Sequence, residues 1–213
     1  FQHLEEGPPE GFVAPAEQAP WARAALRAVD EAVDCAALRE FVPLASNADC
    51  DGARLTPDPY SRPLAALRRI LVETRVYHAL ASEWIAREKP DLAIVYLQGT
   101  DAIGHIFAAY APPRLPSVSA HDFARYSEVP ARYFQTVDRM IAEYRVLAER
   151  LGATLLLASD HGFTWSDGRP ETLSSFATAT AGKWHREEGI YLAWGPQVTP
   201  GRGADGRIDQ VTA

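Results

Sequence analysis

The stretch TLLLASDHGF, residues 154–163, joins an apolar run to a carboxylate and an imidazole. A short continuous apolar run is typical of a strand buried on both faces of a parallel sheet, where a charged side chain is costly. Yet Asp160 and His161 follow this run directly, with Gly162 behind them. Because ligands of open α/β sheets bind beyond the carboxyl ends of the strands, this pair indicates a ligand site.

The remaining sequence surrounds this stretch with alternating helical and strand patterns. Pro90 ends one helical pattern, and Gly152 closes another in the position that a C-terminal glycine prefers. Strand, helix and strand in this order predict an α/β fold with a mostly parallel sheet flanked by helices. The predicted helices are residues 21–41, 64–87 and 131–151, and the further predicted strands are residues 92–97 (LAIVYL) and 189–195 (GIYLAWG).

The domain organisation follows from composition and length. Residues 1–20 are rich in Pro, Gly and Glu and are predicted to be extended or disordered. Residues 21–213 are long enough for one domain with a core of its own, in which we interpret residues 21–63 as a helical and loop insert.

Net charge restricts the possible partners. The chain has 213 residues and a formal net charge of -7, which predicts no basic face for a nucleic acid duplex or for anionic lipid. No apolar run approaches the roughly 18 residues of a transmembrane segment. The only cysteines, Cys35 and Cys50, could form one disulfide or remain two free thiols. A phosphate site on such an acidic chain needs local positive charge, which a metal could supply.

Five residues form the candidate metal site. Asp101 and His105 lie four positions apart after the predicted strand 92–97, Asp160 and His161 follow residues 154–158, and His185 precedes the last predicted strand. Carboxylate and imidazole are ligands of divalent metals such as zinc. A turn or helix brings residues i and i+4 together, and Gly162 allows the bend that two adjacent ligands need.

The number of candidate ligands suggests two ions. Catalytic zinc commonly takes three ligands from the protein, so five exceed one site. We expect Asp101, His105 and His185 to hold one ion, with Asp160 and His161 as part of a second site. Two ions roughly 3.5–4 Å apart suit in-line displacement at phosphorus, so Asp101 and Asp160 should lie within about 10 Å of each other.

Three segments resemble the type I phosphodiesterase and nucleotide pyrophosphatase branch of the alkaline phosphatase superfamily. They are VYLQGTDAIGH, LLLASDHGF and WHREEGIYLAWGP, in the order of that family, and the resemblance covers roughly residues 64–213. It implies an alkaline phosphatase-like fold, two divalent metal ions of the zinc type, and hydrolysis of a small-molecule phosphate ester through a covalent phospho-enzyme. Many relatives are extracytoplasmic, which favours a periplasmic or secreted location; the residues themselves leave the compartment open.

The chain departs from that family in one respect. The family begins with a strand that carries another metal-binding Asp, followed by a Ser or Thr nucleophile, and neither pattern is present. We therefore expect the nucleophile upstream of Phe1, a domain incomplete at both ends, and a fragment that is inactive alone. No catalytic residue is assigned within the chain.

Other readings of the same residues stay open. Asp101, His105 and His185 could form the two-His, one-carboxylate triad of a mononuclear non-haem iron oxygenase. A degenerate relative that binds anions without catalysis is a further alternative. Asp101 and Asp160 could instead cap helices. His78, His121 with Asp122, and Asp160 faintly match the all-helical HD phosphohydrolases, against which the three strand-like runs argue.

Overall fold

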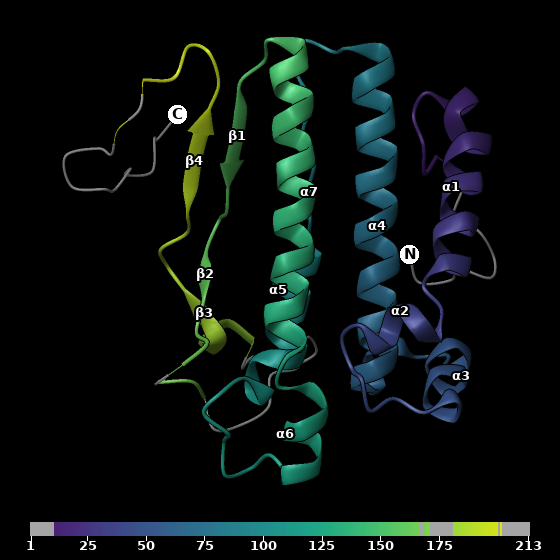
Figure 1. The fold of residues 1–213 in the computed structure, drawn as a ribbon, viewed down its shortest axis with the longest axis vertical. Coiled ribbons are helices and arrows are strands. Elements are labelled where there is room, and N and C mark those ends of the chain that lie inside the picture. Colours follow the sequence, from purple (N-terminus) through teal and green to yellow (C-terminus); the bar gives the residue numbers. More distant parts are fainter. Residues whose placement is uncertain (1–10, 167, 171–180, 200, 202–213) are drawn as a thin grey trace.

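The computed structural model describes residues 11–166, 168–170, 181–199 and 201 of the chain. The fold is mixed and rich in helices, with two small sheets beside them (Figure 1). The α-helices are α1 (Ala19–Ala32), α2 (Cys35–Arg39), α3 (Asn47–Leu55), α4 (Pro63–Glu88), α5 (Gly99–Phe107), α6 (Ala120–Tyr126) and α7 (Val129–Leu151). The 3-10 helices are η1 (Ala16–Gln18), η2 (Pro59–Ser61), η3 (Ala108–Tyr110) and η4 (Ala181–Trp184), and the strands are β1 (Leu155–Ala158), β2 (Gly162–Phe163), β3 (His185–Arg186) and β4 (Tyr191–Trp194).

The two long helices confirm the helical patterns of the sequence. Helix α4 ends where Lys89 takes a left-handed conformation, with φ of 49°, directly before Pro90. Helix α7 ends at Gly152, whose φ of 64° suits a residue without a Cβ atom. The predicted helix over residues 21–41 is divided into α1 and α2, because Asp34 caps a new helix by accepting a hydrogen bond from the Ala37 amide at 2.9 Å.

The start of the described chain is more ordered than its composition suggests. η1 and the first two residues of α1, Ala19 and Pro20, fall within residues 1–20, for which the sequence predicts extended or disordered chain. Pro20 stands in the first turn of α1, where its missing amide hydrogen costs nothing. The Pro-rich composition therefore reflects a helix start here, and residues 1–10 lie outside the described part.

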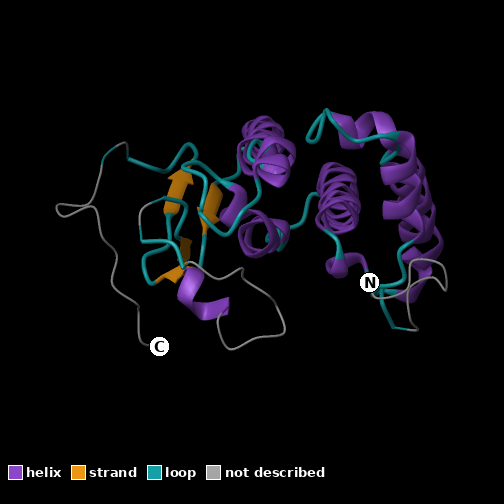
Figure 2. Ribbon diagram, turned by 90° about the horizontal axis from the view of Figure 1, so that it is seen from below, coloured by secondary structure: helices purple, strands orange, loops and turns teal. Residues whose placement is uncertain are grey.

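The hydrophobic core belongs to the helical side of the molecule. Helices α1, α3 and α5 pack against α4, and α7 packs against both α4 and α5. Leu67, Ile70 and Leu71 of α4 are fully buried within this core. Seen from below, the helices form one side of the molecule and the strands the other (Figure 2). No described helix has the length and apolar character needed to cross a membrane.

The strands differ from the predicted parallel sheet. β1 pairs antiparallel with β4, with Leu155 opposite Trp194, and β2 pairs antiparallel with β3, with Phe163 opposite His185. Strands β1 and β4 confirm two of the sequence patterns as strands. The described residues contain no parallel pair, so the mostly parallel sheet is not formed by them.

The prediction of buried strands is wrong for two apolar runs. Residues 92–97 are not in a strand, and Leu92 and Ile94 have exposed fractions of 75% and 85%. On β1, Leu156 is 66% exposed. Because a buried strand needs both neighbours for its backbone and cover for both faces, an apolar sequence stays exposed where the described residues do not supply both.

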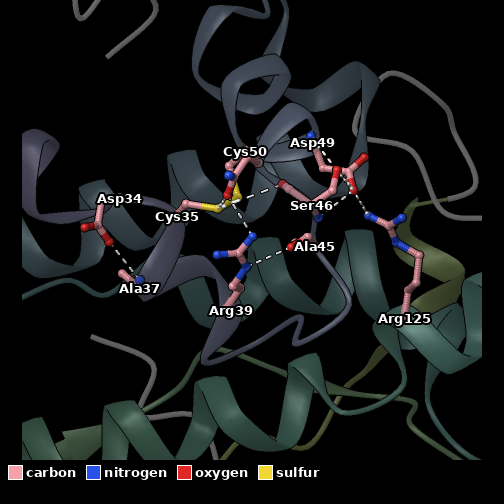
Figure 3. The surroundings of a disulfide bond; sticks show 10 residues. Asp34, Cys35, Ala37, Arg39, Ala45, Ser46, Asp49, Cys50 and Arg125 are labelled. Atoms are coloured by element: carbon pink, nitrogen blue, oxygen red, sulfur yellow. Dashed lines mark hydrogen bonds and ion pairs between the residues drawn. A yellow bond between two sulfur atoms is a disulfide. The ribbon is translucent and has the colours of Figure 1, made fainter.

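A disulfide joins α2 to α3. Cys35 and Cys50 are bonded, with their Cα atoms 5.4 Å apart, which decides between the bridge and the free thiols (Figure 3). Beside the bridge, Arg39 donates hydrogen bonds to the Ala45 carbonyl at 2.8 Å and to the Asn47 side chain at 2.9 Å. This segment was predicted as helix and loop, and the bridge ties it into a unit.

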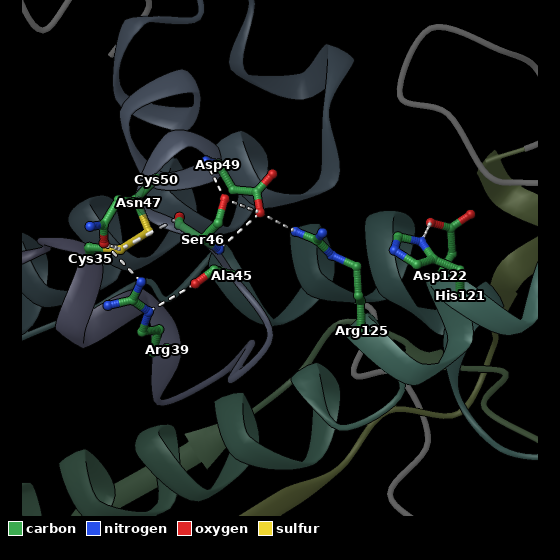
Figure 4. A network of polar contacts seen from close by, with 10 residues as sticks. All are labelled: Cys35, Arg39, Ala45, Ser46, Asn47, Asp49, Cys50, His121, Asp122 and Arg125. Carbon is green, nitrogen blue, oxygen red and sulfur yellow. Dashed lines mark hydrogen bonds and ion pairs between the residues drawn. A yellow bond between two sulfur atoms is a disulfide. The ribbon is translucent and has the colours of Figure 1, made fainter.

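Helix α3 was not predicted, and a capping box explains it. The Asp49 amide donates to the Ser46 hydroxyl at 3.1 Å, and the Ser46 amide donates to the Asp49 carboxylate at 2.9 Å. Asp49 also pairs with Arg125 of α6 at 3.1 Å, so the same carboxylate ties α3 to α6 (Figure 4).

Candidate metal centre

Four of the five candidate ligands come together in the structure. The Asp101 Oδ1 atom lies 3.3 Å from His105 Nε2, 3.4 Å from His185 Nε2 and 3.7 Å from His161 Nε2. Three imidazole nitrogens therefore surround one carboxylate oxygen. We call Asp101, His105, His161 and His185 the Asp–His cluster.

Local structure places each member of the cluster. Asp101 and His105 stand four residues apart on α5, so both point from the same face of that helix. His185 begins β3, which pairs with β2 so that His185 faces Phe163. His161 precedes β2, and its ring stacks on that of His185 with centroids 3.9 Å apart and planes 19° apart.

Phe163 and Gly104 set the spacing behind the cluster. The Phe163 ring meets the His105 ring edge-on at 5.2 Å and the His185 ring at 5.6 Å. A Cβ atom on Gly104 would lie 2.5 Å from the Phe163 ring, closer than side chains approach. Glycine is therefore required at position 104 for β2 to pack this closely on α5. Sequence analysis missed both residues, because nothing local marks Phe163 as the neighbour of Gly104.

The electrostatics of Asp101 favour a bound cation. Oδ1 of Asp101 is buried, and no hydrogen bond from the described residues reaches it, although His105 Nε2 lies 3.3 Å away. Burial raises the pKa of Asp101, but contact with His105 and the positive charges of His185 and His161 together outweigh it and lower the pKa. A buried carboxylate oxygen without a hydrogen bond is costly unless a cation binds it.

The histidines are also suited to a metal. Burial first, and then the neighbouring His161, lower the pKa of His185 despite the opposite effect of Asp101, which favours the neutral imidazole. Only a neutral imidazole has a lone pair for a metal ion. The Nε2 atoms of His105 and His185 are 3.0 Å apart, a contact that requires either one shared hydrogen or a common cation.

The ligand atoms of Asp101, His161 and His185 all lie within 4.8 Å of one another. The sequence predicts that His161 binds a second ion together with Asp160. In the structure, its ligand atom lies close to those of Asp101 and His185 as well. The set contains imidazole and carboxylate, which fits zinc and similar divalent ions.

Asp160 lies at the margin of the cluster. Its side chain is 84% exposed, and its Oδ2 atom is 3.8 Å from His161 Nε2. Since Asp101 and Asp160 both lie within 4 Å of that nitrogen, their carboxyl groups are well within ten ångströms of each other. Neither aspartate caps a helix: Gln98 is the N-cap of α5, and Asp160 precedes a strand.

The remaining described histidines lie elsewhere. His78 of α4 contacts Glu143 of α7 at 3.1 Å, and His121 contacts its neighbour Asp122 at 3.4 Å near the start of α6. Within the described residues they do not join Asp160, so the HD phosphohydrolase pattern is not formed.

The fold and the cluster thus define a mixed helix and strand protein with a carboxylate and imidazole site of the kind that holds divalent metal. The family model of type I phosphodiesterase / nucleotide pyrophosphatase matches residues 16–211. The chain belongs to this family, which confirms the resemblance found in the three sequence segments. Comparison with the curated proteins and with the solved structures found no match.

Proposed function

We propose that this chain carries the metal site of a phosphoric ester hydrolase of the phosphodiesterase type, acting on small-molecule phosphate esters. The observation that carries the proposal is the buried Asp101 Oδ1 atom, which lies close to three imidazole nitrogens and which no hydrogen bond from the described part of the chain satisfies. Membership of the family supports the reaction class.

The Asp–His cluster would hold a divalent ion, which when bound supplies the positive charge that a phosphate oxygen needs. Asp160, whose exposed carboxylate lies 3.8 Å from His161 Nε2, is available to a second ion, as a two-zinc site requires. The chain's residues prepare this site in two ways. Asp101 supplies the negative charge, and Phe163 keeps the imidazoles of His105 and His185 in position.

We assign no nucleophile within the chain.

For the fold, we propose that residues 92–97 and β1 run parallel to each other as neighbours in a mostly parallel, alkaline phosphatase-like sheet. Each follows a long helix, α4 or α7, and both return in the same direction along the molecule (Figure 1). This is the chain path of a parallel pair joined by a crossover.

The disulfide between Cys35 and Cys50 supports an extracytoplasmic location, either periplasmic or secreted. Disulfides persist in oxidising compartments and are rare where thiols are kept reduced.

Metal binding by the purified 213-residue chain tests the proposal. We expect titration calorimetry to show Zn²⁺ binding, with affinity reduced at least tenfold in Asp101→Asn, which removes the negative charge, and in His185→Ala, which removes a ligand nitrogen. His121→Ala is the matched control, since this exposed histidine lies outside the cluster.

Phosphodiesterase activity is then measured on the protein encoded by the whole gene, with bis(4-nitrophenyl) phosphate as the probe. We expect Asp101→Asn and His185→Ala to abolish it and His121→Ala to retain it. Wild-type activity in both cluster variants would overturn the assignment. Purification with about one iron per chain and no zinc would favour the oxygenase triad instead.

A further inference from the structure

Arg169 is a buried arginine in the turn after β2, only 7% exposed, which the sequence analysis did not single out. Its guanidinium donates from Nη1 to the carbonyls of Ala108 at 2.8 Å and Ala111 at 2.6 Å, and from Nη2 to the carbonyl of Pro113. Its Nε–H donates to the Ser166 carbonyl at 3.1 Å, within the same turn. One side chain therefore holds four backbone carbonyls.

Three of these carbonyls, those of Ala108, Ala111 and Pro113, belong to the segment that directly follows α5. α5, which carries Asp101 and His105, ends at Phe107, and η3 follows it directly. Ala108 is the C-cap of α5, and its carbonyl also accepts from the Ala111 amide at 3.2 Å, so Arg169 is a second donor to it. The guanidinium there also complements the dipole at this end of the helix. Arg169 thus holds the segment that directly follows α5, the helix that carries Asp101 and His105.

The backbone of Arg169 belongs to the part of the chain that carries the other two ligands, His161 and His185. It lies in the segment that follows His161 and β2, and β2 pairs with β3, whose first residue is His185. Trp184, fully buried next to His185, packs in one cluster with Ala108 and Ala109, beside the carbonyls that Arg169 holds. In Figure 1, β2 and β3 lie next to α5, so the two parts of the chain that carry the ligands are neighbours.

We propose that Arg169 is a positioning residue of the Asp–His cluster: it joins the turn after β2 to the end of α5 and so sets the distance between the two pairs of ligands. This inference rests on the proposed metal site. The planar guanidinium with its five N–H groups can hold several carbonyls at once, whereas a lysine ammonium cannot reproduce that fork. Arg169→Lys therefore keeps the charge and loses the clamp.

The experiment compares Arg169→Lys and Arg169→Gln with the wild-type chain. The control is Arg39→Gln, since Arg39 also donates to a backbone carbonyl but lies beside the disulfide, away from the cluster. We expect both Arg169 variants to bind Zn²⁺ about 10- to 100-fold more weakly in chelator competition, as loss of outer-shell support of a metal site does. We also expect the visible spectrum of the Co²⁺-loaded chain to change, while Arg39→Gln keeps the wild-type affinity and spectrum.

A metal-free readout separates this inference from the metal site itself. Long-range ¹H–¹⁵N spectra of the metal-free chain report the ring nitrogens of His105 and His185, which are 3.0 Å apart. We expect both resonances to shift in Arg169→Lys and to stay in place in Arg39→Gln. If the wild-type chain binds no Zn²⁺ or Co²⁺, the proposed function fails, while these shifts still decide the role of Arg169.

Three outcomes would overturn the inference. Wild-type affinity, Co²⁺ spectrum and imidazole resonances in both folded Arg169 variants would show that the clamp does not position the ligands. A loss of stability without any change in these three readouts would show a purely structural role. Failure of both variants to fold would likewise show a purely structural role.

Discussion

Similar apolar sequences are buried on the helical side of this molecule and exposed on its strand side. Leu67, Ile70 and Leu71 on α4 are fully buried, whereas Leu92 and Ile94 in an equally apolar run are largely exposed. A helix satisfies its backbone hydrogen bonds internally and needs cover on its apolar face alone. An extended segment needs neighbours along both edges and cover on both faces. Apolar composition therefore decides burial only where the architecture supplies a partner.

The Asp–His cluster lies where these two sides meet. α5 packs on the helical core through α4, and it carries Asp101 and His105. His161 and His185 come from the strand side, around β2 and β3. A metal ion at this place would link a self-sufficient core to segments that have few contacts of their own.

The largest expected effect contrasts two leucines. Leu67→Ala on α4 should lower the free energy of unfolding by about 2–5 kcal/mol, because it leaves a cavity in a packed core. Leu156→Ala on β1 should change it by less than about 0.5 kcal/mol, because that side chain is already in solvent. Urea unfolding followed by circular dichroism measures both. Equal losses would mean that β1 is covered in solution and would remove the contrast.

The disulfide is the next test. Replacing both Cys35 and Cys50 by Ala should cost about 3 kcal/mol, the value expected for a bridge that closes a loop of 15 residues. Since the bridge joins α2 to α3 on the helical side, Zn²⁺ affinity at the cluster should remain that of the wild-type chain. A reducing agent should destabilise the wild-type chain and leave the double variant unchanged. A parallel loss of metal affinity would show that the two sides are coupled through this segment.

The smallest expected effect concerns the cap of α3. Ser46→Ala should cost about 1 kcal/mol, because the Asp49 amide loses its acceptor. Thermal unfolding near neutral pH measures the change. An unchanged midpoint would mean that the capping box adds nothing to α3.

The same cap predicts a pH dependence. Hydrogen bonds from the Ser46 backbone and side chain, with Arg125, lower the pKa of Asp49 from 3.8 despite the opposing effect of burial. Because the folded pKa is depressed, the stabilisation is complete above the unfolded value and is lost as the pH falls through the folded value. The stability difference between wild type and Asp49→Asn should therefore close in acid. Asp51→Asn, exposed on the same helix and outside the capping box, is the control variant.

The long helices could be predicted because their signals are local. Apolar spacing, Pro90 and Gly152 lie within the helices or beside their ends, and α4 and α7 follow them closely. Helix α3 was missed because Ser46 and Asp49 are also turn-forming residues, so the cap looked like a loop. The pairing of β1 with β4 could not be predicted from the sequence, because the paired residues Leu155 and Trp194 are 39 positions apart.

The candidate site shows the same division between local and remote information. The types and places of Asp101, His105, Asp160, His161 and His185 could be identified because each follows or precedes an apolar run. That His161 lies with Asp101, His105 and His185 could not, since His161 and His185 come together through strand pairing. Arg169 gave no signal, because the carbonyls of Ala108 and Ala111 lie 61 and 58 residues away in the chain.

The sequence by itself determined the two long helices and their ends, the family, and the residue types of the candidate ligands. Periodicity and capping act over a few residues, and side-chain chemistry does not depend on the fold. Only the tertiary structure decided that Asp101 gathers three imidazoles, that Asp160 stays at the margin, and that an apolar run such as residues 92–97 remains exposed. These outcomes depend on contacts between distant segments, whose energies no short stretch of sequence contains.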